Sequence, residues 1–248
     1  LVNVNASEKE YNTVAFIGGS ITEQNTWVGS GKDPMRENEE YEGLAQYFSR
    51  EYNTQYVINA GVSGTGSGLA AYRLNDQVLK YNPDLVFIEF AVNDSTRTDS
   101  EKMREVEALI RLIKEHDANT EIALLFTAAR TERVDSQMQQ ELADYYGLKF
   151  VDLYDALLKT FTYGNTTHQS LDTDGDGKLS ESEVVDWYTT GPHVNDAGGH
   201  RYADYIKTKI EATDSILGYK PKSVESLSGY NMSKPQFTSA AALSNDTY

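Results

Sequence analysis

One serine and one histidine, far apart in the sequence, are the residue types that nucleophilic catalysis needs. Ser20 follows a short apolar run and two glycines, and His193 stands in the loop Gly191–Asn195. Glycines before a serine permit a tight turn that presents its hydroxyl, and a histidine can take the hydroxyl proton during attack on a carbonyl carbon. Taken alone, Gly-Gly-Ser fits a helix cap better, so the hypothesis depends on the surrounding residues.

The other histidines are weaker candidates for the base. His116 lies at the end of a helical pattern among charged residues, and His168 lies in a polar loop. His200 falls inside a helical pattern that begins near Asp196, where a structural role is expected. His193 stands in the loop just before that helix, so we predict that it is the base.

A second group of residues has the spacing of an EF-hand calcium loop. Residues 172–183 place carboxylates at loop positions 1, 3 and 5, glycine at position 6 and glutamate at position 12. Calcium favours oxygen ligands in such a flexible cage, and the glycine permits its sharp turn. The predicted ligands are Asp172, Asp174, Asp176, the carbonyl of Lys178 and the bidentate carboxylate of Glu183, with Ser180 acting through water. A solvated acidic loop is the alternative, and it leaves this register unexplained.

Both groups need elements that position them, and the chain alternates strand-like with helical segments. Apolar runs predict strands at residues 13–17, 55–59, 84–90, 121–126 and 149–151. Helical spacing predicts helices at about 40–51, 69–80, 99–116, 132–146 and 196–212. Strands that are apolar throughout are typical of a parallel sheet buried on both faces. The sequence therefore predicts an α/β fold, a three-layer α/β/α sandwich around a parallel sheet.

The loops after the first three predicted strands hold the residues of interest. These loops are Gly18–Thr22, Ala60–Gly66 and Ala91–Asp94. In a parallel sheet, functional groups gather at the carboxyl ends of the strands. We therefore expect all three loops to open onto one edge of the sheet, together with Ser20.

Four segments resemble, in the same order, the sequence blocks of the SGNH/GDSL hydrolases, a family of serine esterases. They are Gly18–Thr22, Ile58–Gly64, Ala91–Asp94 and His193–His200. The resemblance covers about residues 11–212 and implies the five-stranded, flavodoxin-like sheet of the SGNH hydrolase fold. It implies that Ser20 is the nucleophile and His193 the base. The Ser20 amide, the Gly64 amide and the Asn93 side chain would then hold the oxyanion.

Two positions depart from the family's pattern. Ala91 stands where the third block usually begins with glycine, and Thr190 stands where an aspartate usually precedes the histidine by three residues. An acid normally orients the imidazole and stabilises its charged form. Three explanations stay open: a backbone carbonyl holds the imidazole, another acid such as Asp186 reaches it, or catalysis has been lost and the protein only binds.

The predicted calcium loop lies between the last predicted strand and His193. A single loop without a paired partner favours structural calcium rather than signalling. We therefore expect calcium to fix the helix at residues 181–188 and so to position His193, partly replacing the missing aspartate.

Composition narrows the classes of partner and compartment. The net charge of −16 argues against nucleic acid and an anionic membrane, and no segment has the length and hydropathy of a membrane span. The absence of cysteine excludes disulfides and thiol chemistry. Because the chain begins at Leu1, we interpret it as a mature or trimmed form, and we expect a secreted bacterial protein.

The expected substrate is an acylated carbohydrate, with acetyl removal from polysaccharide as the leading hypothesis. A general short-chain esterase or lysophospholipase is the alternative among enzymes, and an inactive carbohydrate-binding or scaffold-associated module is the alternative of another class. Residues 1–212 are expected to form the hydrolase domain with the calcium loop inserted at 172–183. Residues 213–248 are expected to be a C-terminal strap or a linker within a larger multimodular protein.

Overall fold

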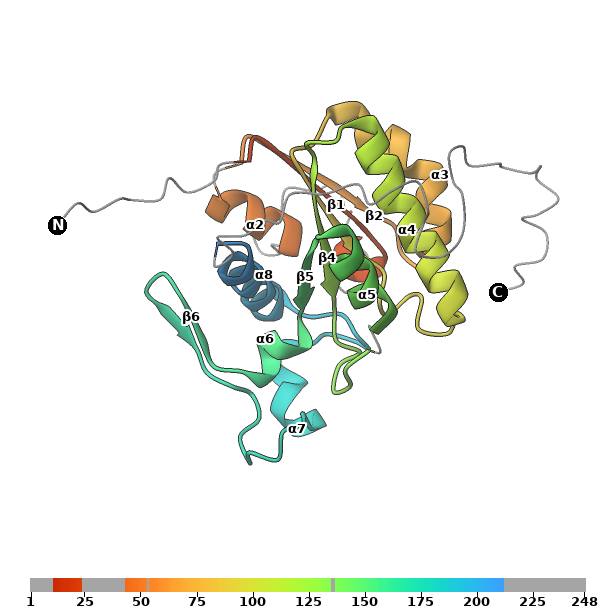
Figure 1. Cartoon of the computed structure of the whole chain (residues 1–248). Helices are drawn as coiled ribbons and strands as arrows, with labels where there is room; N and C mark the ends of the chain where they lie inside the picture. Colours follow the sequence, from red (N-terminus) through yellow and green to blue (C-terminus); the bar gives the residue numbers. More distant parts are fainter. Residues whose placement is uncertain (1–10, 24–42, 53, 135–136, 212–248) are drawn as a thin grey trace, which may run out of the picture.

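In a computed structural model of the chain, residues 11–23, 43–52, 54–134 and 137–211 are described (Figure 1). They form a central sheet covered by helices on both faces. Its strands are β1 (Thr13–Gly18), β2 (Tyr56–Gly61), β3 (Leu85–Glu89), β4 (Glu121–Phe126) and β5 (Lys149–Asp152). Their spatial order is β2-β1-β3-β4-β5, and all neighbours pair in parallel. The prediction of a five-stranded parallel sheet inside an α/β/α sandwich is confirmed.

Each strand supplies both layers of the core, because successive side chains of a strand point to opposite faces. Phe16 and Phe87 pack in one core, whereas their neighbours Ile17 and Ile88 pack in the other. The helices of the first layer are α2 (Leu44–Tyr52), α6 (Tyr154–Leu158) and α8 (Asp196–Glu211), and those of the second are α3 (Ser67–Gln77), α4 (Asp99–His116) and α5 (Gln137–Tyr146). Burial on both faces explains why the inner strands β1, β3 and β4 are almost entirely apolar.

Several short elements were not predicted. They are α1 (Ser20–Glu23), the 3-10 helix η2 (Leu79–Tyr81) and an antiparallel hairpin of β6 (Phe161–Tyr163) and β7 (Thr166–His168). The helix expected at residues 181–188 is present as α7 (Glu181–Val184) and the 3-10 helix η3 (Val185–Trp187). The hairpin strands are three residues long and mostly polar, so they give no periodic signal. The buried guanidinium of Arg201 on α8 donates to the carbonyls of Ala156 and Gln169, which lie before and after the hairpin in the chain.

One predicted helix begins later than expected. The prediction of a helix from residue 132 is wrong at its start, because Ala129 and Glu132 form a bridge and Arg130 takes a left-handed φ of 61°. The described part of this helix, α5, runs over Gln137–Tyr146. The predictions for residues 40–42, for residue 212 and for the strap or linker at 213–248 lie outside the described residues.

The strand register brings three loops level at one edge of the sheet. Gly18 at the end of β1 lies beside Gly61 of β2 on one side and Glu89 of β3 on the other. Because β1 pairs with both β2 and β3, the strand order reverses at this point, which is where ligand sites form in such sheets. Ser20 follows β1 directly. Among the described helices, none has the length and hydropathy needed to cross a bilayer.

Candidate active site

Ser20 and His193 meet at this edge of the sheet, although 173 residues separate them in sequence. The Ser20 Oγ lies 2.8 Å from the Nε2 of His193. The other ring nitrogen, Nδ1, lies 2.8 Å from the carbonyl oxygen of Thr190. A carbonyl oxygen only accepts hydrogen bonds, so Nδ1 must carry the proton. Nε2 of the neutral ring is then free to accept the serine proton, which is the tautomer that a general base needs.

A tight turn holds the Thr190 carbonyl in place. The His193 amide donates to this same oxygen over 3.1 Å, which closes a four-residue turn. Gly191 has a φ of 53° and Pro192 fixes a negative φ after it, as in a type II′ turn. The Thr189 amide donates to the His193 carbonyl over 2.8 Å and continues the hairpin. The backbone of this hairpin therefore sets the direction of the imidazole.

The Thr190 carbonyl takes the place where an orienting acid would act. Asp186 lies in η3, and its backbone carbonyl accepts a hydrogen bond from the Asn195 side chain over 2.6 Å. The arrangement at Nδ1 has the geometry of the first explanation, in which a backbone carbonyl holds the imidazole.

The predicted oxyanion donors come from the neighbouring loops. Asn93 packs directly against Gly19, where a Cβ would lie only 2.1 Å from the Asn93 Oδ1, so a larger residue at 19 would displace this amide. Gly64 has a φ of 72°, which favours glycine. The loop before it is tied to the nucleophile turn, because the Val62 amide donates to the Gly18 carbonyl over 3.0 Å. The structure thus places all predicted donors at the edge that carries Ser20.

Two charged side chains that the sequence analysis did not single out support these loops. The Arg73 guanidinium donates to the carbonyls of Gly18 and Ala60, and so links the ends of β1 and β2. The buried Asp94 accepts from the Ser67 amide over 3.1 Å, at the start of α3 and just after the Gly64 loop. Burial raises the pKa of Asp94 above its ordinary value. A further acidic residue, Glu89, lies next to the Gly18–Thr22 turn that carries Ser20.

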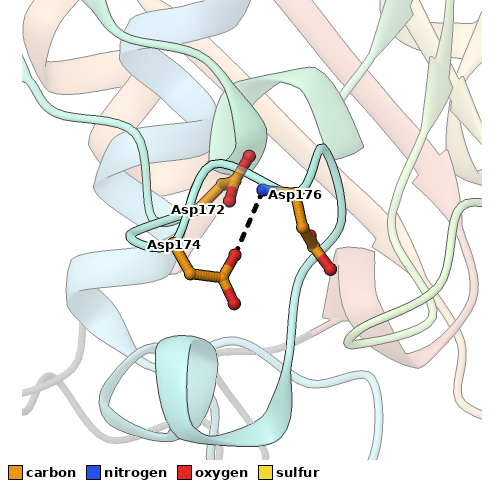
Figure 2. A group of neighbouring side chains, drawn as sticks. All are labelled: Asp172, Asp174 and Asp176. Atoms are coloured by element: carbon orange, nitrogen blue, oxygen red, sulfur yellow. Dashed lines mark hydrogen bonds between the residues drawn. The ribbon is translucent and has the colours of Figure 1, made fainter.

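Three of the predicted calcium ligands lie close together in the acidic loop. Ligand oxygens of Asp172, Asp174 and Asp176 lie within 4.8 Å of one another (Figure 2). The Asp176 amide donates to the Asp174 carboxylate over 3.1 Å, and Gly177 has a φ of 81°. Three convergent carboxylates in an oxygen-rich turn fit the chemistry of a calcium ion.

Glu183 lies outside this group of three in the described structure. Its carboxylate accepts from the amides of Ser180 and Thr173, over 2.8 and 2.6 Å. These hydrogen bonds, with that of the Ser180 amide the strongest influence, lower the pKa of Glu183 to about 2. The carboxylate is therefore ionised and lies at the end of the same loop.

Arg130 connects α7, which begins inside this loop, with the hairpin that carries His193. Its Nε donates to the Glu181 carboxylate of α7 over 2.6 Å, and its guanidinium lies over the ring of Tyr188, 5.5 Å from the centroid. Tyr188 pairs with Val194, next to His193. A chain of contacts thus runs from α7 to the base.

A groove of about 740 Å³ lies along the outer edge of β2, away from this pair. Tyr56 and Tyr81 line one part of it, and its lining extends to Val62. Ser20 and His193 are not among its lining residues, so the groove is distinct from the candidate catalytic centre.

Comparison with known proteins gives one family and a shared fold. A profile of the GDSL-like lipase/acylhydrolase family matches residues 16–201 of the 248. A search of curated proteins gave no match. Among solved structures, a two-domain esterase active on acetylated mannans has 24% identity and a TM-score of 0.57. That match covers 86% of this chain and 53% of the esterase, so the chain spans about half the length of that protein.

Two further structures are similar over most of their own length. An acetyl xylan esterase has 23% identity and a TM-score of 0.56, with 79% of this chain and 98% of that chain covered. A GDSL-like lipase from Bacteroides thetaiotaomicron has 19% identity and a TM-score of 0.54, with 81% and 88% covered. At these identities the likeness shows the fold.

Proposed function

Because the chain belongs to the GDSL-like lipase/acylhydrolase family, we propose that it is a serine esterase that removes acetyl groups from carbohydrate esters. The observation that carries the proposal is the 2.8 Å contact between Ser20 Oγ and His193 Nε2, in the tautomer that lets Nε2 accept a proton. Structural likeness to esterases of acetylated mannan and of xylan supports acetylated polysaccharide as the substrate class.

The proposed reaction has two halves. The Ser20 Oγ attacks the acetyl carbonyl carbon while His193 takes its proton, and the Ser20 amide, the Gly64 amide and the Asn93 side chain bind the oxyanion. Each such donor lowers a barrier of this kind by roughly 3 kcal/mol. The imidazolium then protonates the departing sugar oxygen, so that the sugar leaves with a free hydroxyl. In the second half His193 activates water, which attacks the acetyl-enzyme and releases acetate.

The function is tested by acetate release from an aryl acetate and from acetylated xylan. We expect Ser20→Ala and His193→Ala each to lower kcat by at least about a thousandfold, as losses of nucleophile or base do. Ser100→Ala and His116→Ala are matched controls on exposed positions of α4 and should keep wild-type rates. Full activity in Ser20→Ala would show that Ser20 is not the nucleophile.

The substrates also separate the remaining hypotheses. Hydrolysis of the aryl acetate without release from xylan would favour a general short-chain esterase or lysophospholipase. Absence of wild-type activity on both, with calcium present, would favour an inactive carbohydrate-binding module.

We further propose that the loop at residues 172–183 binds calcium, and that the protein works outside the cell, where calcium is abundant. The convergence of Asp172, Asp174 and Asp176 supports the site. The carbonyl of Lys178 and the carboxylate of Glu183 complete the proposed ligand set. Calcium would hold the loop against α7 and, through Arg130, steady the hairpin of His193.

Calcium binding is measured by titration calorimetry and by the melting temperature. We expect calcium at a hundred times its Kd to stabilise the fold by about 2.7 kcal/mol, since it binds the folded loop. Asp172→Asn with Asp176→Asn should abolish both effects. Lys178→Ala is the control, because only its carbonyl is a proposed ligand. If chelated protein kept its full kcat and melting temperature, the proposed link between calcium and His193 would be wrong.

A further inference from the structure

A carboxylic acid lies buried directly under the nucleophile turn. Glu89 is the last residue of β3, and only 1% of its surface is exposed. Its Oε2 accepts from the Thr22 hydroxyl over 2.9 Å, and its Oε1 accepts from the Thr127 hydroxyl over 2.8 Å. The amide of Gly19 lies close enough to this carboxyl to lower its pKa. All of these donors are neutral, so none of them forms an ion pair with the carboxyl that would offset the free-energy cost of burying it.

These partners enclose Ser20. Thr22 follows the serine by two residues and donates to the Glu89 carboxyl, and the amide of Gly19, just before the serine, lies near the same carboxyl. Thr127 follows β4, on the far side of Glu89. Asn93, from the same strand end as Glu89, packs on Gly19 from another direction. The position of Ser20 is therefore fixed by contacts that converge on Glu89.

The fold alone does not require an acid here. The preceding residues of β3 are Phe87 and Ile88, and both pack in apolar cores. Burying a carboxyl costs free energy that an apolar side chain at the end of the strand would not cost. Perturbed buried acids of this kind cluster at functional sites.

We propose that Glu89 is a positioning residue for catalysis: its carboxyl fixes the Gly19–Thr22 turn so that the Ser20 hydroxyl meets His193 and the Ser20 amide faces the oxyanion. The proposal rests on the proposed esterase function. A shift of the turn by about 1 Å would be enough to lower the rate by two orders of magnitude.

The charge of Glu89 is consistent with this role. Burial is the main cause that raises its pKa above the ordinary 4.5, and the nearby Asp94 raises it further. The Tyr202 hydroxyl of α8 also lies within electrostatic reach. Burial therefore shifts this carboxyl toward its neutral form.

The test compares Glu89→Gln with Glu89→Met on the aryl acetate. Gln keeps the shape and an acceptor for Gly19, and threonine hydroxyls can accept from its amide group. Met fills similar volume without those hydrogen bonds. We expect Glu89→Gln to keep kcat within about threefold, and Glu89→Met to lower kcat between about 10- and 100-fold with KM nearly unchanged.

A control and a second readout separate positioning from folding. Glu107 on α4 is equally buried and bonds to the Tyr146 hydroxyl in the other layer, so Glu107→Met removes a buried acid away from Ser20 and should keep kcat. In NMR spectra, the amide signals of Gly19 and Ser20 should move in Glu89→Met and stay in Glu89→Gln.

Two outcomes overturn the proposal. One is a Glu89→Met variant with wild-type kcat, and the other is unmoved Gly19 and Ser20 amide signals in that variant. The NMR result tests the placement of the turn even if the wild-type protein cleaves no ester. A wild-type protein that cleaves no ester would overturn the proposed function instead. If Glu107→Met lowered kcat as much as Glu89→Met does, general destabilisation would explain the effect of both variants.

Discussion

At the scale of single residues, a peptide carbonyl stands where the family usually has an acid. The Thr190 carbonyl accepts the Nδ1 proton of His193 and so fixes both the ring orientation and the tautomer. A carbonyl dipole stabilises the imidazolium less than a full negative charge does, so orientation is its main contribution. The Thr190 side chain takes no part in this contact.

This arrangement gives opposite predictions for two adjacent residues. We expect Thr190→Ala to keep kcat within about twofold, because every residue supplies the same carbonyl. Gly191→Ala should cost roughly 1–2 kcal/mol and lower kcat several-fold, since its left-handed φ of 53° disfavours a Cβ. Both are measured by steady-state kinetics and thermal melting. A tenfold loss of activity in Thr190→Ala, with stability unchanged, would show that the side chain contributes.

Sequence patterns identify side chains better than backbone groups. Ser20, Gly64 and Asn93 stand in blocks whose order and spacing predict their place at one sheet edge. The Thr190 carbonyl left no pattern, because hydrogen bonds of the backbone depend on the turn and not on the residue type. Glu89 left a clear signal, an acid inside an apolar run, but its meaning needed the contacts with Thr22 and Thr127.

At the scale of elements, α7 and the His193 hairpin are linked through one arginine. Arg130 pairs with Glu181 across a partly exposed contact, with side-chain exposures of 23% and 65%. Exposed ion pairs contribute at most about 1 kcal/mol to stability, so the contact can matter more for the placement of the hairpin than for folding.

We expect Glu181→Gln and Arg130→Ala to lower kcat a few-fold with little change in melting temperature, because the hairpin loses its tie to α7. Lys159→Ala is the matched control, since it breaks an exposed pair with Asp155 on another part of the surface. The rates are measured with calcium in excess. A fall in melting temperature without a change in kcat would assign the pair to stability alone.

Local signals decided which elements could be predicted. The helix predicted at 99–116 is confirmed as α4. Thr98 and Glu101 form a capping box at its start, which is a local signal for the beginning of a helix. The β6–β7 hairpin lacks such signals, and its place depends on Arg201 reaching back from α8. The start of α5 was misplaced because the bridge between Ala129 and Glu132 replaces a helical turn.

At the scale of the whole molecule, buried acids couple folding to pH. Burial raises the pKa of Glu89 and of Asp94 in the folded protein. Between the ordinary pKa and the raised one, the folded state binds more protons than the unfolded state, so stability falls as pH rises. The contribution of each group is greatest below its ordinary pKa and is lost as pH rises through the folded value.

We expect wild-type protein to lose stability relative to Glu89→Gln as pH rises above the ordinary pKa of 4.5, by up to about 1.4 kcal/mol per pH unit. Asp94→Asn should likewise lose less stability than wild type as pH rises. The measurement is the free energy of unfolding in denaturant across a pH series. Parallel curves for wild type and Glu89→Gln would contradict a raised pKa at Glu89.

The carbonyl that orients His193 also has a consequence for how this site is inherited. Codons specify side chains, so no point mutation can delete the Thr190 carbonyl, and a deep mutational scan would score position 190 as tolerant. Exchange of the Thr190–Gly191 peptide bond for an ester would keep this carbonyl but weaken it as a hydrogen-bond acceptor, and so would test the contact directly. Among point mutations, those at Gly191 and Pro192 would therefore be the ones to disturb this contact, because their turn aims the carbonyl at the ring.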